Sequence, residues 1–167
     1  MIKLSEGVLL AEGDILQLNS EMISILRDEC FLSKKKRARI NFHQSNECLV
    51  HEMIVALHIL TEIDPHRHLN KTESFHIISG DLSVAILDFE TFEPKSIINL
   101  SASSTNCYYR LNTPDFHLVI PRSEIVIMHE TTQGPFEPNQ SSDNPYAFGG
   151  STRMPVESIK NLVLSKK

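Results

Sequence analysis

The sequence predicts an all-β protein with one short helix near the N-terminus, and two observations lead to this fold class. From residue 49 onward the chain is a series of short apolar and β-branched runs that Gly, Pro, Asn, Asp and Ser separate. Strands at such close spacing are typical of a sandwich or a small barrel. The second observation is a pair of histidines followed by a carboxylate, a metal-ligand pattern that suits paired strands. The expected strands cover residues 49–60, 74–79, 82–88, 95–100, 107–111, 116–120 and 124–129.

The helix is predicted over residues 21–31, ahead of these strands. Ser20 is a suitable N-cap, and Glu21 follows it in the first turn. Apolar residues recur near helical spacing at Met22, Ile23, Ile25, Leu26 and Cys30. We expect this amphipathic helix to cover the β-structure.

At 167 residues the chain is the size of one domain. Within it we distinguish an N-terminal arm and covering helix (residues 1–48), a β-barrel core (49–136) and a C-terminal loop and packing segment (137–167). Pro, Asn and Ser over residues 138–145 indicate the loop, and the amphipathic run at 156–164 indicates a piece that packs back on the core.

Composition argues for a small-molecule ligand. The net charge is −5 and the pI is near 5.9, which gives no broad attraction to nucleic acid or to anionic lipid. The basic run at 34–39 is interpreted as a solvated helix end. The three cysteines are odd in number and far apart, so we expect free thiols.

No apolar stretch approaches the ~18 residues of a membrane span, and the N-terminus lacks a signal-peptide layout. A cytoplasmic protein without membrane contact is therefore expected. Short apolar runs in the first twenty or so residues, such as 8–10 and 15–16, suit edge strands or an arm. Edge strands of this kind can pair two subunits, so a homodimer is possible.

The strongest signal for function is the run from His66 to Gly80. His66 and His68 stand two residues apart, so on a strand their rings point to the same face. The next four residues suit a hairpin turn, after which Glu73 returns on the inward face of the following strand. Two imidazoles and one carboxylate can therefore reach the same ion.

This run resembles the first sequence motif of the cupin superfamily, G-x5-H-x-H-x3,4-E-x6-G, although the initial glycine is absent here. The second cupin motif, P-x-G-x-x-H, resembles the segment from Pro114 to His117, which is two residues shorter and lacks the glycine. The resemblance implies a cupin or jelly-roll β-barrel. A displaced His117 would leave three ligands. The metal ligands that the resemblance implies are His66, His68, Glu73 and His117.

A wider resemblance covers about residues 14 to 150. Segments 35–43, 65–68, 73–76 and 129–136 are similar to the WbuC family of cupin-fold metalloproteins. Members of that family are met in bacterial surface-polysaccharide gene clusters. The resemblance therefore implies a link to O-antigen or capsule sugar metabolism, without naming a reaction.

Three histidines and one carboxylate offer imidazole nitrogens and one hard oxygen. This donor set suits one divalent ion of Zn, Fe, Mn, Ni or Co. The sequence does not choose among these metals. An octahedral ion would keep two positions for water or substrate.

Further histidines and one carboxylate are candidates for the wall of a ligand pocket beside the predicted metal ion. Glu130 ends an expected inward strand, where it is either a general base, a ligand for a sugar hydroxyl, or a surface carboxylate. His43 either reaches the pocket or is a solvated loop residue. Strand alternation turns His76 away from Glu73 and lets at most one of His51 and His58 face inward.

The leading functional hypothesis is a metal-dependent small-molecule enzyme, an isomerase, epimerase or hydrolase, that acts on a carbohydrate or sugar nucleotide in surface-polysaccharide biosynthesis. One alternative is a non-catalytic, metal-dependent sugar-binding or sensor module. Another is an Fe(II)-dependent dioxygenase, which the same ligand set permits. Because one fold hosts many functions, the fold alone selects none of these.

Overall fold

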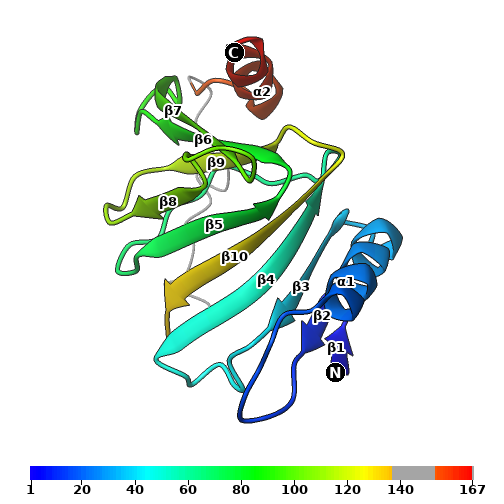
Figure 1. The fold of residues 1–167 in the computed structure, drawn as a ribbon. Coiled ribbons are helices and arrows are strands. Elements are labelled where there is room, and N and C mark those ends of the chain that lie inside the picture. Colours follow the sequence, from blue (N-terminus) through cyan, green and yellow to red (C-terminus); the bar gives the residue numbers. More distant parts are fainter. Residues whose placement is uncertain (137–152, 167) are drawn as a thin grey trace.

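The computed structural model describes residues 1–136 and 153–166. Its ten described strands form one sheet in the order β1-β2-β3-β4-β10-β5-β8 and a second in the order β7-β6-β9 (Figure 1). The strands are β1 (Ile2–Ser5), β2 (Val8–Leu10), β3 (Arg37–Asn41), β4 (Val50–His58), β5 (Glu73–Ser79), β6 (Asp81–Leu87), β7 (Pro94–Ser101), β8 (Tyr108–Leu111), β9 (His117–Pro121) and β10 (Ile125–Gln133). The all-β prediction is confirmed, but the described strands make two sheets and not a closed barrel.

The main core lies between the two sheets, because alternate residues of each strand turn toward the opposite sheet. In β4, Met53, Val55 and Leu57 face this core, whereas Ile54 and Ala56 face the helix on the other side. The members of the core are Met53, Val55, Leu57, Phe75, Ile77, Leu82, Val84, Leu100, Tyr109, Val119, Val126 and Met128. We call the side of the large sheet that faces this core its inner face.

Helix α1 (Ser20–Leu32) covers the outer face of the large sheet (Figure 1). Its buried residues Leu26 and Cys30 pack against the outward residues of β3 and β4. The predicted N-cap was wrong by one residue. Asn19 is the cap, because its side-chain oxygen accepts the Met22 N–H at 2.9 Å, and Ser20 is the first helical residue.

The basic run at 34–39 lies only in part at a helix end, as its first half follows the C-cap Ser33 of α1 directly. Its second half begins β3, which pairs antiparallel with β4 and parallel with β2. Ala38 and Ile40 are the apolar, outward residues of this strand and lie under α1. Strands β1 and β2 extend the sheet beyond β3, and β1 is its exposed outer strand.

The small sheet is covered by helix α2 (Val156–Ser165) (Figure 1). Ile159 and Val163 are buried against the outward residues of β6 and β9, so the C-terminal segment does pack on the core. The predicted loop at 138–145 lies outside the described residues. Within the described part of the chain, no helix is both long and apolar enough to cross a membrane.

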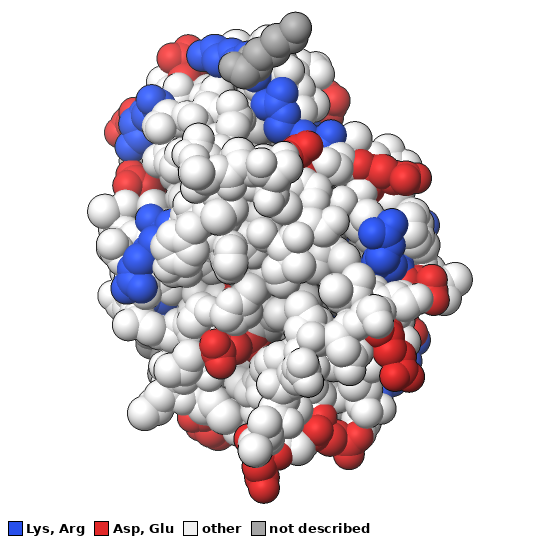
Figure 2. All heavy atoms as spheres, in the orientation of Figure 1, with Lys and Arg blue, Asp and Glu red and all other residues white. Residues whose placement is uncertain are grey.

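Figure 2 shows that charged side chains of both signs are interspersed around the rim of the face seen in Figure 1, whose middle is largely free of them. On this face neither sign forms a broad continuous patch, in keeping with the modest net charge of −5.

The tight link between β5 and β6 explains why a glycine closes the run from His66 to Gly80. Gly80 has φ +84°, and a Cβ there would lie 2.7 Å from the carbonyl oxygen of Ile125. We expect Gly80→Ala to lower the free energy of unfolding by at least about 2 kcal/mol, because it adds a backbone clash to the left-handed strain. Gly13→Ala is the matched control for strain alone, since Gly13 also has positive φ but its Cβ would meet no atom closer than 3.7 Å. Urea unfolding measures both variants, and an equal loss in the two would contradict the clash.

Candidate metal centre

The histidine pair lies in an extended segment between β4 and β5, and not in a regular strand as predicted. The segment is held by one β-bridge, in which the His66 N–H donates to the His117 carbonyl at 3.0 Å and the His117 N–H donates to the His66 carbonyl at 2.8 Å. Alternation still operates, because the intervening Arg67 points away and lies over the ring of Phe116, 4.8 Å from its centroid. The two imidazoles are therefore presented together, with ring centroids 5.2 Å apart.

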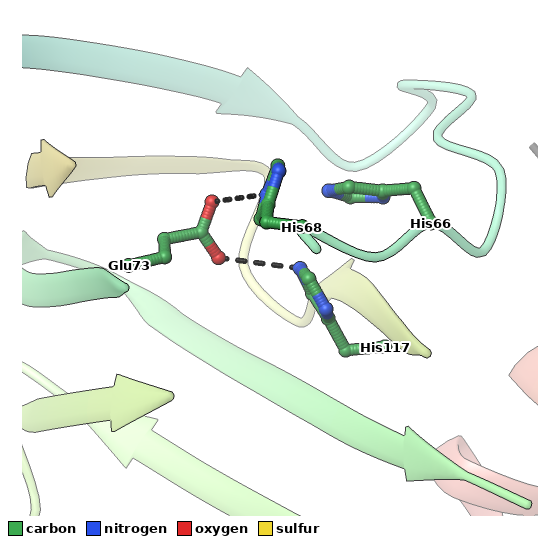
Figure 3. A group of neighbouring side chains, drawn as sticks. All are labelled: His66, His68, Glu73 and His117. Atoms are coloured by element: carbon green, nitrogen blue, oxygen red, sulfur yellow. Dashed lines mark hydrogen bonds and ion pairs between the residues drawn. The ribbon is translucent and has the colours of Figure 1, made fainter. Parts of the chain in front are cut away.

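The other two predicted metal ligands, Glu73 and His117, come from different sheets. Glu73 begins β5 of the large sheet and His117 begins β9 of the small one. Glu73 Oε1 lies 3.3 Å from His68 Nε2, and Glu73 Oε2 lies 3.2 Å from His117 Nε2 (Figure 3). One possible ligand atom from each of the four residues lies within 4.8 Å of all the others. The four residues predicted as ligands are thus gathered in one place.

The cluster fits a divalent ion. An ion bound at about 2.1 Å places opposite ligand atoms about 4.2 Å apart, so the observed limit of 4.8 Å requires only a small inward movement. Glu73 and His117 are 5% and 0% exposed, yet Glu73 Oε2 and His117 Nε2 have no hydrogen-bond partner among the residues that the structure describes. Although these atoms are 3.2 Å apart, they are not aligned as a hydrogen bond. Buried polar atoms of this kind require a partner, and a cation between them would supply it.

Electrostatics keep two of the donor groups, His66 and Glu73, in the forms that a cation needs. Burial, reinforced by the nearby His117, lowers the pKa of His66 to about 4, so its imidazole is neutral at pH 7. Burial opposes ionisation of Glu73, but the adjacent His117 and His68 imidazoles outweigh it and hold the pKa of this carboxyl well below its usual range. Glu73 is therefore a carboxylate.

Glu130 lies on the inner face of β10, as predicted. It is paired with Phe75 of β5 and Met53 of β4, and both of these side chains belong to the core. Burial, together with the charge of Glu73, raises the pKa of Glu130 to about 8. This carboxyl is half-buried, has a pKa near neutrality and lies on the same face as the four-residue cluster. It therefore has the properties of a proton-transfer group.

This shift makes the stability of the metal-free protein depend on pH. Between about pH 4.5 and about pH 8 the folded state retains a proton on Glu130 that the unfolded chain has released. The stabilisation is therefore complete below the lower value and is lost as pH rises through the upper one. We expect the free energy of unfolding of Glu130→Gln, relative to wild type, to increase across this window. Urea unfolding in the presence of a chelator measures it, and a difference that does not change with pH would contradict the raised pKa.

His43 lies beyond the end of β3 and does not join the metal cluster. Its Nδ1 lies 3.1 Å from the Glu52 carbonyl oxygen, and its ring stacks on that of His51, with centroids 4.1 Å apart and planes 2° apart. His51 is buried on the inner face of β4 opposite Thr132, whereas His58 packs edge-on against Phe31 of α1. Of the two histidines on β4, one thus faces inward, and His43 covers it from the loop.

Two polar groups on the inner face were not among the predicted site residues. Tyr109 of β8 is 5% exposed and packs beside Phe75, and its hydroxyl has no hydrogen-bond partner among the described residues. Burial, and then the charge of Glu73, raise the pKa of Tyr109. Asn41 of β3 is 6% exposed, and in the described ranges its Oδ1 also lacks a hydrogen-bond partner. Strand alternation places both side chains inward, but only the folded structure reveals that their polar atoms are unsatisfied.

An open depression of about 210 Å³ lies beside His68. Most of its lining residues are polar and come from the β4–β5 connection and from the segments near β8 and β10, so a hydrophilic ligand can approach the cluster from this side. The lining residues are His68, Leu69, Asn70, Lys71, Thr72, Asn112, Pro114 and Gln133.

Comparison with known proteins supports the fold. A family model described as a domain of unknown function (DUF6016) matches residues 18–95. A search of curated proteins found no match. The chain is similar to the capsular polysaccharide assembling protein CapF from Staphylococcus aureus, with a TM-score of 0.54 and 13% identity, over 68% of this chain and 32% of CapF. It thus spans about a third of the length of CapF.

One further solved structure has the same type of fold. A conserved protein with a double-stranded β-helix domain from Klebsiella pneumoniae matches with a TM-score of 0.50 and 15% identity, over 67% of this chain and 81% of that one. The chain therefore has a fold of the double-stranded β-helix type, with a cluster of three histidines and one glutamate that could bind a metal ion.

Proposed function

We propose that the protein binds one divalent metal ion through His66, His68, Glu73 and His117 and is an enzyme acting on a carbohydrate or sugar nucleotide. The observation that carries this proposal is the four-residue cluster itself, whose ligand atoms lie within 4.8 Å of one another. Within the described part of the chain, two of its buried atoms that face each other, Glu73 Oε2 and His117 Nε2, have no hydrogen-bond partner, and an ordinary polar hairpin would not leave such atoms unsatisfied.

The bound ion would act as a Lewis acid or lower the pKa of a bound water. The chain's own residues supply the remaining functions. Glu130 lies one inward residue along β10 from Thr132, which is paired with Glu73. Inward residues on a strand repeat at about 7 Å, so Glu130 can exchange a proton with a ligand held beside the cluster. The Tyr109 hydroxyl, on the other side of Phe75, can donate a hydrogen bond to the same ligand.

Two likenesses support a role in surface-polysaccharide biosynthesis. The first is the similarity of several segments to the WbuC family of cupin-fold metalloproteins. The second is the structural similarity to CapF, which is described as a capsular polysaccharide assembling protein. Both suggest a carbohydrate ligand, and we propose the pathway on that basis.

The test is a turnover assay on metal-loaded protein with a panel of nucleotide sugars and free aldoses, followed by proton NMR. We expect isomerisation, epimerisation or hydrolysis of at least one compound, and its loss in a His66→Ala/His68→Ala variant. His76→Ala is the matched control, because His76 is exposed on the opposite face of β5 from Glu73. Turnover that survives the double substitution would contradict a metal-dependent enzyme.

The alternatives give different results in the same experiment. Saturable binding without chemical change of any compound would indicate the sugar-binding or sensor module. Oxygen consumption that depends on Fe(II) and on a candidate substrate would indicate the dioxygenase.

A further inference from the structure

Strand β3 has an unusual alternation. Its outward residues Ala38 and Ile40 are the apolar ones and lie under α1. Its inward residues are Arg37, Arg39 and Asn41, whose partners on β4 are the core residues Leu57, Val55 and Met53. A strand in the middle of a large sheet normally turns apolar side chains toward the core, so three polar residues in succession on this face require a function.

This polar stripe of β3, formed by Arg37, Arg39 and Asn41, shares the inner face with the candidate metal centre. The pairing register places Asn41, Met53, Glu130 and Phe75 in one row across β3, β4, β10 and β5. Neighbouring strands are about 4.8 Å apart, so the backbones of Asn41 and Glu130 are separated by about 10 Å. Both arginines also lie within electrostatic range of Glu130. One ligand of sugar size can therefore contact the stripe and Glu130 together.

The stripe presents unsatisfied groups of complementary kinds. Among the described residues, neither guanidinium has a hydrogen-bond or ion-pair partner. For Arg39, contact with water explains the missing partner, since that side chain is exposed. Water does not account for the missing partner of Asn41, which is 6% exposed and whose Oδ1 accepts no hydrogen bond from residues 1–136 or 153–166. A buried acceptor of this kind requires a donor, such as a hydroxyl group.

We propose that the polar stripe of β3 binds an anionic carbohydrate, with the arginines on a carboxylate or phosphate and Asn41 on a neighbouring hydroxyl; this inference rests on the proposed function. Guanidinium groups match the planar geometry of carboxylate and phosphate oxygens, and they form charge-assisted hydrogen bonds with them. The stripe selects the substrate, while the metal cluster and Glu130 lie beside it on the same face.

The test compares three probes by isothermal titration calorimetry: glucose, glucuronate and glucose 1-phosphate. They differ in the presence and the kind of anionic group. Each is titrated into metal-loaded and metal-free protein, with metal content measured on the same samples. The variants are Arg39→Gln and Arg37→Gln/Arg39→Gln. The matched control is Lys34→Gln, which removes one positive charge from an exposed residue in the turn before β3.

We expect at least one anionic sugar to bind wild type about tenfold more tightly than glucose. This preference should decrease in Arg39→Gln, disappear in Arg37→Gln/Arg39→Gln and persist in Lys34→Gln. The better of the two anionic probes identifies the group as carboxylate or phosphate. A metal ion can also attract anions, but that preference would survive loss of the arginines, and its survival would overturn the proposal.

Equal affinity for all three probes, or no binding of either anionic probe in either metal state, would also overturn it. Failure of the proposed function gives a different result. In that case the wild type would hold no metal, while the metal-free titrations would still decide whether the arginines confer the anion preference.

Discussion

Substitution of Glu130 by glutamine is expected to lower turnover by about 100-fold to 10,000-fold, the range typical of a lost general acid or base. Glutamine keeps the size and the hydrogen-bonding capacity of the side chain but cannot exchange a proton at neutral pH. Because Glu130 is not part of the four-residue cluster, metal content and ligand affinity should change little. The measurement is the steady-state rate together with calorimetric affinity for the compound that wild type converts.

Glu52→Gln is the matched control for this prediction. Glu52 lies on the neighbouring strand β4 and is exposed. On the outer face its Oε1 lies 3.4 Å from His129 Nε2. Its substitution should leave the rate within about twofold, as for a surface charge far from the reacting groups. A Glu130→Gln protein that retains wild-type turnover would exclude Glu130 as the proton-transfer residue.

Removal of the metal is expected to lower the melting temperature by roughly 10 °C. A ligand present at about 1,000 times its dissociation constant stabilises the folded state by about 4 kcal/mol. For a chain of 150–250 residues, each kcal/mol corresponds to about 2–4 °C. The physical cause is that the ion would hold Glu73 and three imidazoles together across the two sheets, and these groups would lose their common partner on its removal. Differential scanning calorimetry with and without a chelator measures the shift.

The His66→Ala/His68→Ala variant should melt at the same temperature with and without the chelator. His76→Ala should retain the full wild-type shift, because its ring lies on the other face of β5. A chelator effect that persists in the double variant would place the stabilising ion elsewhere in the protein.

The strands from β4 onward could be predicted from the sequence because turn-forming residues separate them and apolar residues alternate within most of them. Strand β3 could not, since its polar residues face the core side and its apolar residues face the helix. In most strands the apolar residues face the core between the sheets and the polar residues face outward, and β3 has the opposite arrangement. The basic run from Lys34 to Arg39 therefore suggests a solvated segment, although its second half belongs to β3, a strand that pairs with both β2 and β4.

The ligand spacing predicted which residues gather, but it could not predict how. His117 reaches the cluster from the small sheet because its backbone is bridged to His66. The altered second motif gave no indication of that bridge. Likewise, the inward direction of Tyr109 follows from alternation, whereas the absence of a partner for its hydroxyl depends on every neighbouring side chain.

Elemental analysis of gently purified, untagged protein tests the central claim most directly. We expect close to one divalent ion per chain in wild type and in His76→Ala, and almost none in His66→Ala/His68→Ala. The identity of the ion would then direct the search toward hydrolytic, isomerising or oxygen-dependent chemistry. Equal and negligible metal in all three proteins, persisting after reconstitution with Fe(II), Mn(II), Ni(II), Co(II) and Zn(II), would contradict metal binding by this cluster.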